Sequence, residues 1–208
     1  NYVEAKTAAN GTVYKWVKPV NGIPQGKYAP IEILTPPQKK ELSSLSATYN
    51  ISNKTKSGFT ATLSNEDLNL FSDLDAKDNK GFAGEFWLKH SEEFTPQKDT
   101  SSVNWTSKGS VHFINRNFQP VNRFRNVEFN RNWNLENKQN NDEIHSNIST
   151  ALSKKENGKI QLKHEFLRRK NSFEGQRYSL NGNLQKNGYF LNIDGSLLQS
   201  ENSGLNSR

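Results

Sequence analysis

The sequence of 208 residues contains no cysteine and no methionine. Without cysteine, a disulfide framework, a cysteine-ligated zinc site, an iron–sulfur cluster and a thiol nucleophile are all excluded. Apolar runs are short, and none approaches the roughly 18 residues that a membrane-spanning helix requires. The lack of methionine and of any terminal signature predicts that the sequence is a piece of a longer chain.

Hydrophobic residues are scarce at 32%, and the mean hydropathy is −0.91, whereas 28 residues are Asn and 21 are Ser. Asn and Ser side chains compete for their own backbone hydrogen bonds, which favours turns and solvated strand faces over helices. The formal net charge is +7, and most of the excess of Lys and Arg lies after residue 110.

Two regions are predicted from the punctuation of the chain. Residues 1–42 carry repeated Pro and Gly residues, which predict an extended lead segment without a β-ladder and with one short strand at 31–34. Residues 43–208 are predicted to form an antiparallel β domain. A short helix or turn is expected near 64–80, because Leu68, Phe71 and Leu74 are spaced three apart.

Period-two alternation predicts the strands of the β domain. A first hairpin is expected around the polar turn 53–58, followed by strands at 81–90, 103–105, 111–118 and 127–135. The strongest alternation covers 143–199, where four strands form a meander with one apolar and one polar face.

Turn chemistry predicts the register of that meander. Asn187-Gly188 is typical of a two-residue primed turn, which places Leu184 opposite Leu191. The three-residue loop 156–158, with Gly158 at positive φ, is predicted to place Leu152 opposite Leu162 and Ile148 opposite Phe166. The longer connection 170–175 permits two further pairs, namely Phe166 with Leu180 and Leu162 with Leu184.

The predicted fold class is therefore all-β, an antiparallel meander of long amphipathic strands that forms part of a barrel or a large open sheet. A soluble β-sandwich is the alternative. Strand lengths of about eleven residues suit both a membrane barrel and a soluble sandwich, whereas very short turns at one end and a longer loop at the other favour a membrane barrel. Ser146, Thr150 and His164 argue against it, because they interrupt the apolar stripe.

Candidate binding sites for ions are few. Alternate oxygen ligands at Asp73, Asp75, Asp78 and Asn79 resemble the opening of a calcium loop, but Lys77 and a late Gly81 break the pattern. A plain Asx-rich turn is the competing interpretation, so no cofactor is expected apart from this weak calcium candidate. The four His residues, at 90, 112, 145 and 164, show no metal spacing.

A second candidate site is basic. Arg116, Arg123, Arg125 and Arg131 alternate with aromatic residues and could hold an anionic glycan or lipid headgroup; nucleic acid fits this pattern less well. Nucleophile elbows and phosphate-binding Gly loops are absent, and no paired inward carboxylates are evident, so the protein is predicted not to be an enzyme.

Three stretches resemble a known group of proteins. They are Val13-Tyr14-Lys15-Trp16 leading to Gly26-Lys27-Tyr28-Ala29-Pro30, then residues 63–81, then residues 124–133. Together they resemble internal segments of the very large, Asn-rich β-proteins of the Bacteroidota cell envelope, which are similar to giant outer-membrane barrels. The resemblance implies an outer-membrane or periplasmic location and no catalytic residues.

The function expected from the sequence is that of a structural or assembly component of a bacterial outer membrane or cell envelope, whose partners are the rest of a longer parent chain or other envelope proteins. A secreted glycan-binding or adhesive β-sandwich is the alternative. The strand 189–199 is expected to be covered in the working protein, because it lacks the Pro and Lys residues that discourage edge pairing. A methyl group added at Gly182 or Gly195 is expected to crowd a packed pair if both faces of the sheet are covered.

Overall fold

The computed structural model describes residues 1–5, 11–31, 34–74, 76–95, 102–135, 141–154 and 157–202. The chain divides into two compact units, residues 1–36 and residues 37–208. This division lies before the predicted boundary at residue 42, because the first long strand already begins at Lys39. Neither helix within the described ranges has the length and hydropathy needed to cross a bilayer.

The prediction that residues 1–42 contain no β-ladder is wrong, because the N-terminal unit has a small antiparallel one. Strand β1 (Tyr2–Glu4) pairs with β2 (Tyr14–Trp16), and the rings of Tyr14 and Tyr28 lie 4.7 Å apart. Pro and Gly residues interrupt the chain between these segments but leave each strand free to donate backbone hydrogen bonds. Of the strand predicted at 31–34, residues 32 and 33 lie outside the described residues.

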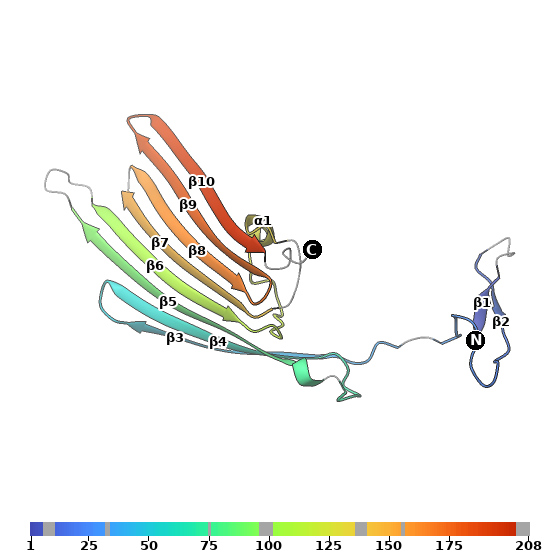
Figure 1. Cartoon of the computed structure of the whole chain (residues 1–208). Helices are drawn as coiled ribbons and strands as arrows, with labels where there is room; N and C mark the ends of the chain where they lie inside the picture. The colour runs from blue at the N-terminus through green and yellow to red at the C-terminus, as the bar shows by residue number, and fades with distance from the viewer. Residues whose placement is uncertain are drawn as a thin grey trace. The chain divides into compact units, whose positions relative to one another are not determined.

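The second unit is one antiparallel meander of eight strands, as predicted (Figure 1). Each strand pairs with its neighbours in sequence, so the sheet is open and β3 and β10 form its edges. The strands are β3 (Lys39–Asn50), β4 (Thr55–Asp67), β5 (Lys80–Phe94), β6 (Val103–Ile114), β7 (Glu143–Lys154), β8 (Gly158–Arg169), β9 (Phe173–Lys186) and β10 (Tyr189–Asn202).

Three local predictions differ from the structure. Residues 103–114 form one strand, not two, because Ser107 and Gly109 obscure the apolar alternation without interrupting pairing. The predicted strand 127–135 is a loop that contains the short helix α1 (Phe129–Asn132). Strands β6 and β7 pair directly with each other, starting with Ile114 opposite Glu143. The other edge of β6 pairs with β5, and that of β7 with β8. The residues between β6 and β7 therefore have no free strand edge to pair with.

The segment near 64–80 also differs in detail from its prediction. Strand β4 continues to Asp67, and the only helical turn described there is the 3₁₀ helix η1 (Ala76–Asp78). Leu68, Phe71 and Leu74 lie in exposed turns and do not share a helix face. Pairing with β5 through Asn65 holds the end of β4 in the sheet.

The Asn187-Gly188 turn is confirmed, with φ values of 50° and 83° and with Leu184 opposite Leu191. Two other predicted registers are wrong by even numbers of residues. Leu152 lies opposite Ile160, and Ile148 opposite His164; across the next connection, Leu162 lies opposite Leu180 and Phe166 opposite Gln176. An even shift keeps every side chain on its face, so matching apolar faces cannot distinguish these registers.

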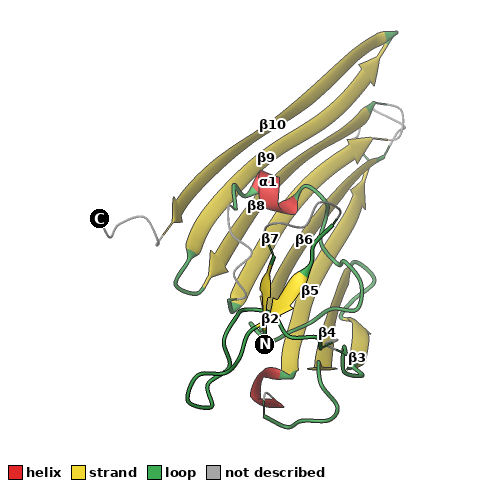
Figure 2. Ribbon diagram, turned by 90° about the vertical axis from the view of Figure 1, so that its right-hand side faces the viewer, coloured by secondary structure: helices red, strands yellow, loops and turns green. Residues whose placement is uncertain are grey.

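One face of the sheet is apolar on all eight strands, and we call it the apolar face. Most of its large apolar side chains are exposed, and one exposed member from each strand is Leu45, Phe59, Phe86, Val111, Ile148, Leu162, Leu180 and Leu197. The opposite, polar face is rich in Ser, Thr, Asn, Lys and Glu. The buried core lies on this polar face, where Trp133 of the loop that contains α1 packs with Leu167 and Phe173 of the sheet. Figure 2 shows α1 in front of the strands.

The two glycines expected to crowd a packed pair do not do so. A Cβ at Gly195 would meet nothing within 4 Å, and one at Gly182 would make ordinary contacts of 3.6 Å or more. The register around them is as predicted, but the apolar face that they belong to is uncovered.

Gly81 is the glycine whose substitution should matter, because the backbone of Asn117 and Phe118 passes directly over it. We expect Gly81→Ala to lower the free energy of unfolding by about 1–3 kcal/mol, as overpacking does in other cores. Gly195→Ala should change it by no more than about 0.5 kcal/mol, as is usual for exposed sites. Thermal melts of the two variants test this, and equal melting temperatures would contradict the close crossing at Gly81.

Candidate functional site: the polar face and the loop that covers it

The loop between β6 and β7, which we call the β6–β7 loop, comprises residues 115–142, of which 115–135 and 141–142 are described. It lies against the polar face. Near its start, the backbone N–H of Gln119 donates to the buried Ser64 hydroxyl of β4 at 3.1 Å. Farther along, Trp133 packs edge-on against His145 of β7 and Phe173 of β9. The loop therefore spans the sheet from β4 to β9.

An ion-pair cluster fastens the β6–β7 loop to the sheet. The Glu143 carboxylate is 4% exposed and accepts hydrogen bonds from Arg125 of the loop and from Arg169 Nε of β8, the latter at 2.8 Å. The Arg125 guanidinium also lies over the rings of Phe124 and Phe129, 5.0 and 4.5 Å from their centroids. Both partners of Glu143 are cations, so its charge is matched within the cluster.

Two histidines lie side by side on the polar face, which their sequence spacing did not indicate. His112 of β6 is directly opposite His145 of β7, and their rings stack at 5.8 Å. Glu85 lies 3.6 Å from His112 Nε2, and Glu165 lies 3.4 Å from His145 Nε2. Burial lowers the pKa of His112 below 6.5, against the opposing effect of Glu85, so this imidazole is neutral near pH 7.

The stability of the protein at acid pH should depend on Glu165, the carboxylate beside His145. Burial raises the pKa of Glu165, but His145 and Lys163 outweigh burial and lower it to about 2 from 4.5. The unfolded chain therefore takes up this proton first as the pH falls, so the stabilisation is complete above about pH 4.5 and is lost between pH 4.5 and 2. Urea unfolding of wild type and Glu165→Gln across this range tests this; we expect the wild type to lose more stability, and parallel pH profiles would contradict it.

The four predicted anion-binding arginines do not act as a set in the structure. Arg125 is engaged with Glu143, and Arg131 pairs with Glu128 at 2.8 Å. Arg123 donates to the Val127 carbonyl at 3.1 Å, and the backbone amide of Arg116 donates to Asp142 at 2.9 Å. A role of these four residues in binding an anion stays a prediction.

The calcium candidate is only partly described, because Asp75 lies outside the described residues. The Asp73 carbonyl accepts from the Ala76 amide at 3.4 Å, and the Asn79 carbonyl accepts from Glu66 at 2.8 Å. Within the described ranges, no three His, Asp or Glu side chains are grouped so that they could hold a metal ion. The calcium hypothesis for these residues also stays a prediction.

A pocket of about 350 Å³ lies between the polar face of β3–β6 and residues 118–124 of the β6–β7 loop. The sheet side presents hydroxyl groups, including Thr62, together with Glu85 and His112, whereas the loop side presents Phe118 and Phe124.

The sequence did not indicate the roles of Trp133 and Glu143, because these roles arise only when the loop meets the sheet. Comparisons of the chain with protein-family models, with characterised proteins and with solved structures give no match.

Proposed function

We propose that the eight-stranded sheet is a lipid-facing wall of a β-barrel in a bacterial outer membrane, and that the protein is a non-catalytic structural or assembly component there. The observation that carries the proposal is the apolar face, which is exposed across all eight strands. Soluble monomers rarely expose contiguous apolar patches larger than a few hundred Å². Transmembrane barrel strands alternate in this way, with apolar side chains towards lipid and polar ones towards the lumen.

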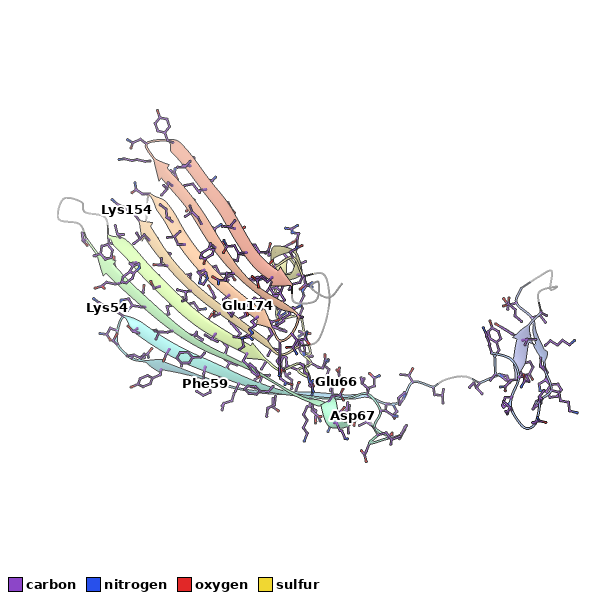
Figure 3. All side chains as sticks on the ribbon, viewed as in Figure 1. Lys54, Phe59, Glu66, Asp67, Lys154 and Glu174 are labelled. Atoms are coloured by element: carbon purple, nitrogen blue, oxygen red, sulfur yellow. The ribbon has the colours of Figure 1, made fainter. Side chains whose placement is uncertain are left out.

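The distribution of charge along the strands supports this proposal. On the apolar face, ion pairs lie near both strand ends: Lys54–Glu92 at 2.5 Å at one end, and Lys39–Glu41 at 2.8 Å at the other. Figure 3 shows Lys54 and Lys154 at one end of the sheet, Glu66, Asp67 and Glu174 at the other, and Phe59 between them. On β7 the apolar-face members between Ile144 and Leu152 span nine residues, close to the roughly 9–11 that a tilted strand needs to cross a bilayer.

Of the three polar side chains that interrupt the predicted apolar stripe, Thr150 and His164 have hydrogen-bond partners on the apolar face. Trp105 Nε1 donates to Thr150 Oγ1 at 2.9 Å, and Thr150 also lies 3.1 Å from the Ser107 hydroxyl. The Tyr178 hydroxyl donates to Gln176 Oε1 at 2.9 Å, and Gln176 Oε1 also lies 3.4 Å from His164 Nε2. Such pairing reduces the cost of placing polar groups in hydrocarbon, which was the argument against a lipid-facing strand.

The open edges at β3 and β10 mean that the proposed barrel needs more than these eight strands. In lipid every backbone group needs a partner, so β3 and β10 require further strands alongside them. The interior of an eight-stranded barrel is just wide enough to be filled by its own side chains. A polar face that carries the β6–β7 loop and Trp133 needs more room, so we assign the missing strands to the rest of a longer parent chain.

Paired single-cysteine variants test the lipid contact, because the sequence has no cysteine of its own. Ile148 lies on the apolar face and its neighbour Ser149 on the polar face, so the two sites differ only in the direction of the side chain. We expect an environment-sensitive fluorophore on Ile148→Cys to be quenched by spin-labelled lipid, and the same fluorophore on Ser149→Cys to be quenched by aqueous acrylamide.

Two results would overturn the proposal. One is equal acrylamide quenching at both sites in a protein that stays monomeric without detergent. The other is protection of position 148 from both quenchers, which would mean that a protein layer covers the apolar face, as in a β-sandwich.

A further inference from the structure

A row of lysines crosses the polar face at one register level. Lys56 of β4 lies opposite Lys89 of β5, which lies opposite Lys108 of β6. The row continues through Ser149 of β7 to Lys163 of β8. Adjacent strands are about 4.8 Å apart, so four ammonium groups are distributed along roughly 19 Å.

This arrangement costs stability. Like charges directly opposite each other on neighbouring strands are destabilising. Lys163 is offset by Glu165 at 2.7 Å, but no carboxylate of the described residues lies within 4.0 Å of the Lys89 or Lys108 ammonium. The β-sheet itself gains nothing from such a row, which points to a ligand that compensates the charge.

Two lysines of the row, Lys89 and Lys108, line a concave site together with Lys159, which is not in the row. A pocket of about 510 Å³ is bounded by Lys89, Lys108 and Lys159, with the hydroxyl groups of Thr106, Ser149 and Ser153 between them. None of its lining residues is acidic. The Thr106 and Ser153 hydroxyl groups donate to Asn104. The donors that face a ligand are therefore the ammonium groups, which can only donate, and the Ser149 hydroxyl, so the site is matched to a ligand that consists mainly of acceptors.

We propose that this pocket binds a soluble anion that carries two or more phosphate groups. Lysine binds phosphate as a point charge, whereas arginine is preferred where planar carboxylates are held by two parallel bonds. The spacing of the lysines suits a ligand whose negative charges are distributed along a chain. The site lies on the polar face, opposite the proposed lipid-facing one, so the two proposals are tested separately.

Calorimetric titration of the folded protein with inorganic tripolyphosphate, pyrophosphate and orthophosphate tests the site. We expect saturable 1:1 binding of tripolyphosphate, weaker binding of pyrophosphate, and weakening by about tenfold for each lysine removed in Lys89→Gln/Lys108→Gln. The matched control, Lys15→Gln/Lys18→Gln, removes the same charge from the N-terminal unit and should bind like wild type. Tripolyphosphate should also raise the melting temperature of wild type and leave that of Lys89→Gln/Lys108→Gln unchanged.

Three outcomes would overturn the inference. They are the absence of saturable binding, equal weakening in both double variants, and equally tight binding of a butanetetracarboxylate. Misfolding does not imitate the expected loss, because removing opposed charges should leave the melting temperature of Lys89→Gln/Lys108→Gln, without ligand, equal to or above that of wild type.

Discussion

Replacing Trp133 with alanine is expected to release the β6–β7 loop from the sheet. Trp133 is 1% exposed and contacts Phe129, His145 and Phe173, so its removal leaves a cavity at the centre of the buried cluster. Truncation of a buried Trp typically costs about 3–5 kcal/mol, and we expect that loss in the free energy that holds the loop on the polar face.

Amide hydrogen exchange measures this loss where it occurs. The amides of Asn132 and Leu135 bond within the loop, to the carbonyls of Glu128 and Asn130, and should exchange much faster in Trp133→Ala. Val127→Ala is the control, because Val127 belongs to the same loop and is 69% exposed. Unchanged exchange in Trp133→Ala would mean that Trp133 does not hold the loop.

Replacing Glu143 with glutamine should have an effect of similar size through charge. The substitution keeps the shape of the side chain but leaves Arg125 and Arg169 without their carboxylate, and Arg169 is largely buried, with 10% of its side chain exposed. Removing one partner of a buried ion pair typically costs about 3–5 kcal/mol, because an uncompensated charge stays in a poorly solvated position.

Glu174→Gln is the matched control for this charge effect. Glu174 of β9 pairs with Arg168 of β8 at 3.5 Å, but both side chains are more than half exposed. Exposed pairs contribute at most about 1 kcal/mol, so urea unfolding should separate the two variants clearly. Equal destabilisation by both substitutions would contradict the burial of the Glu143 cluster.

The pair of Arg125 and Glu143 shows what could not be predicted from the sequence. Arg125 was predicted to hold an external anion, because alternating basic and aromatic residues fit such a site. In the structure Arg125 pairs with an internal anion, Glu143, on a strand that starts after the loop has crossed the sheet. The pairing depends on where the loop lands, and no pattern within residues 115–135 encodes that position.

The sequence alone determined the features that depend on neighbouring residues. Period-two alternation predicts the antiparallel meander and the division into an apolar and a polar face, because side chains on a strand point alternately to opposite sides. Asn187-Gly188 likewise determines the register of β9 and β10, since a two-residue turn with positive φ leaves one alignment of the strands.

Only the tertiary structure decided what depends on the alignment of distant segments. The registers of β7 with β8 and of β8 with β9 differ from the predicted ones by even shifts, which preserve every face and so leave no trace in the pattern. The register of β5 with β6 places Lys89 beside Lys108, and that of β6 with β7 brings His112 beside His145. The buried cluster around Trp133 also depends on distant segments. The loop lies between two strands that are already paired, so it has no free strand edge to extend and buries its aromatic residues against the polar face.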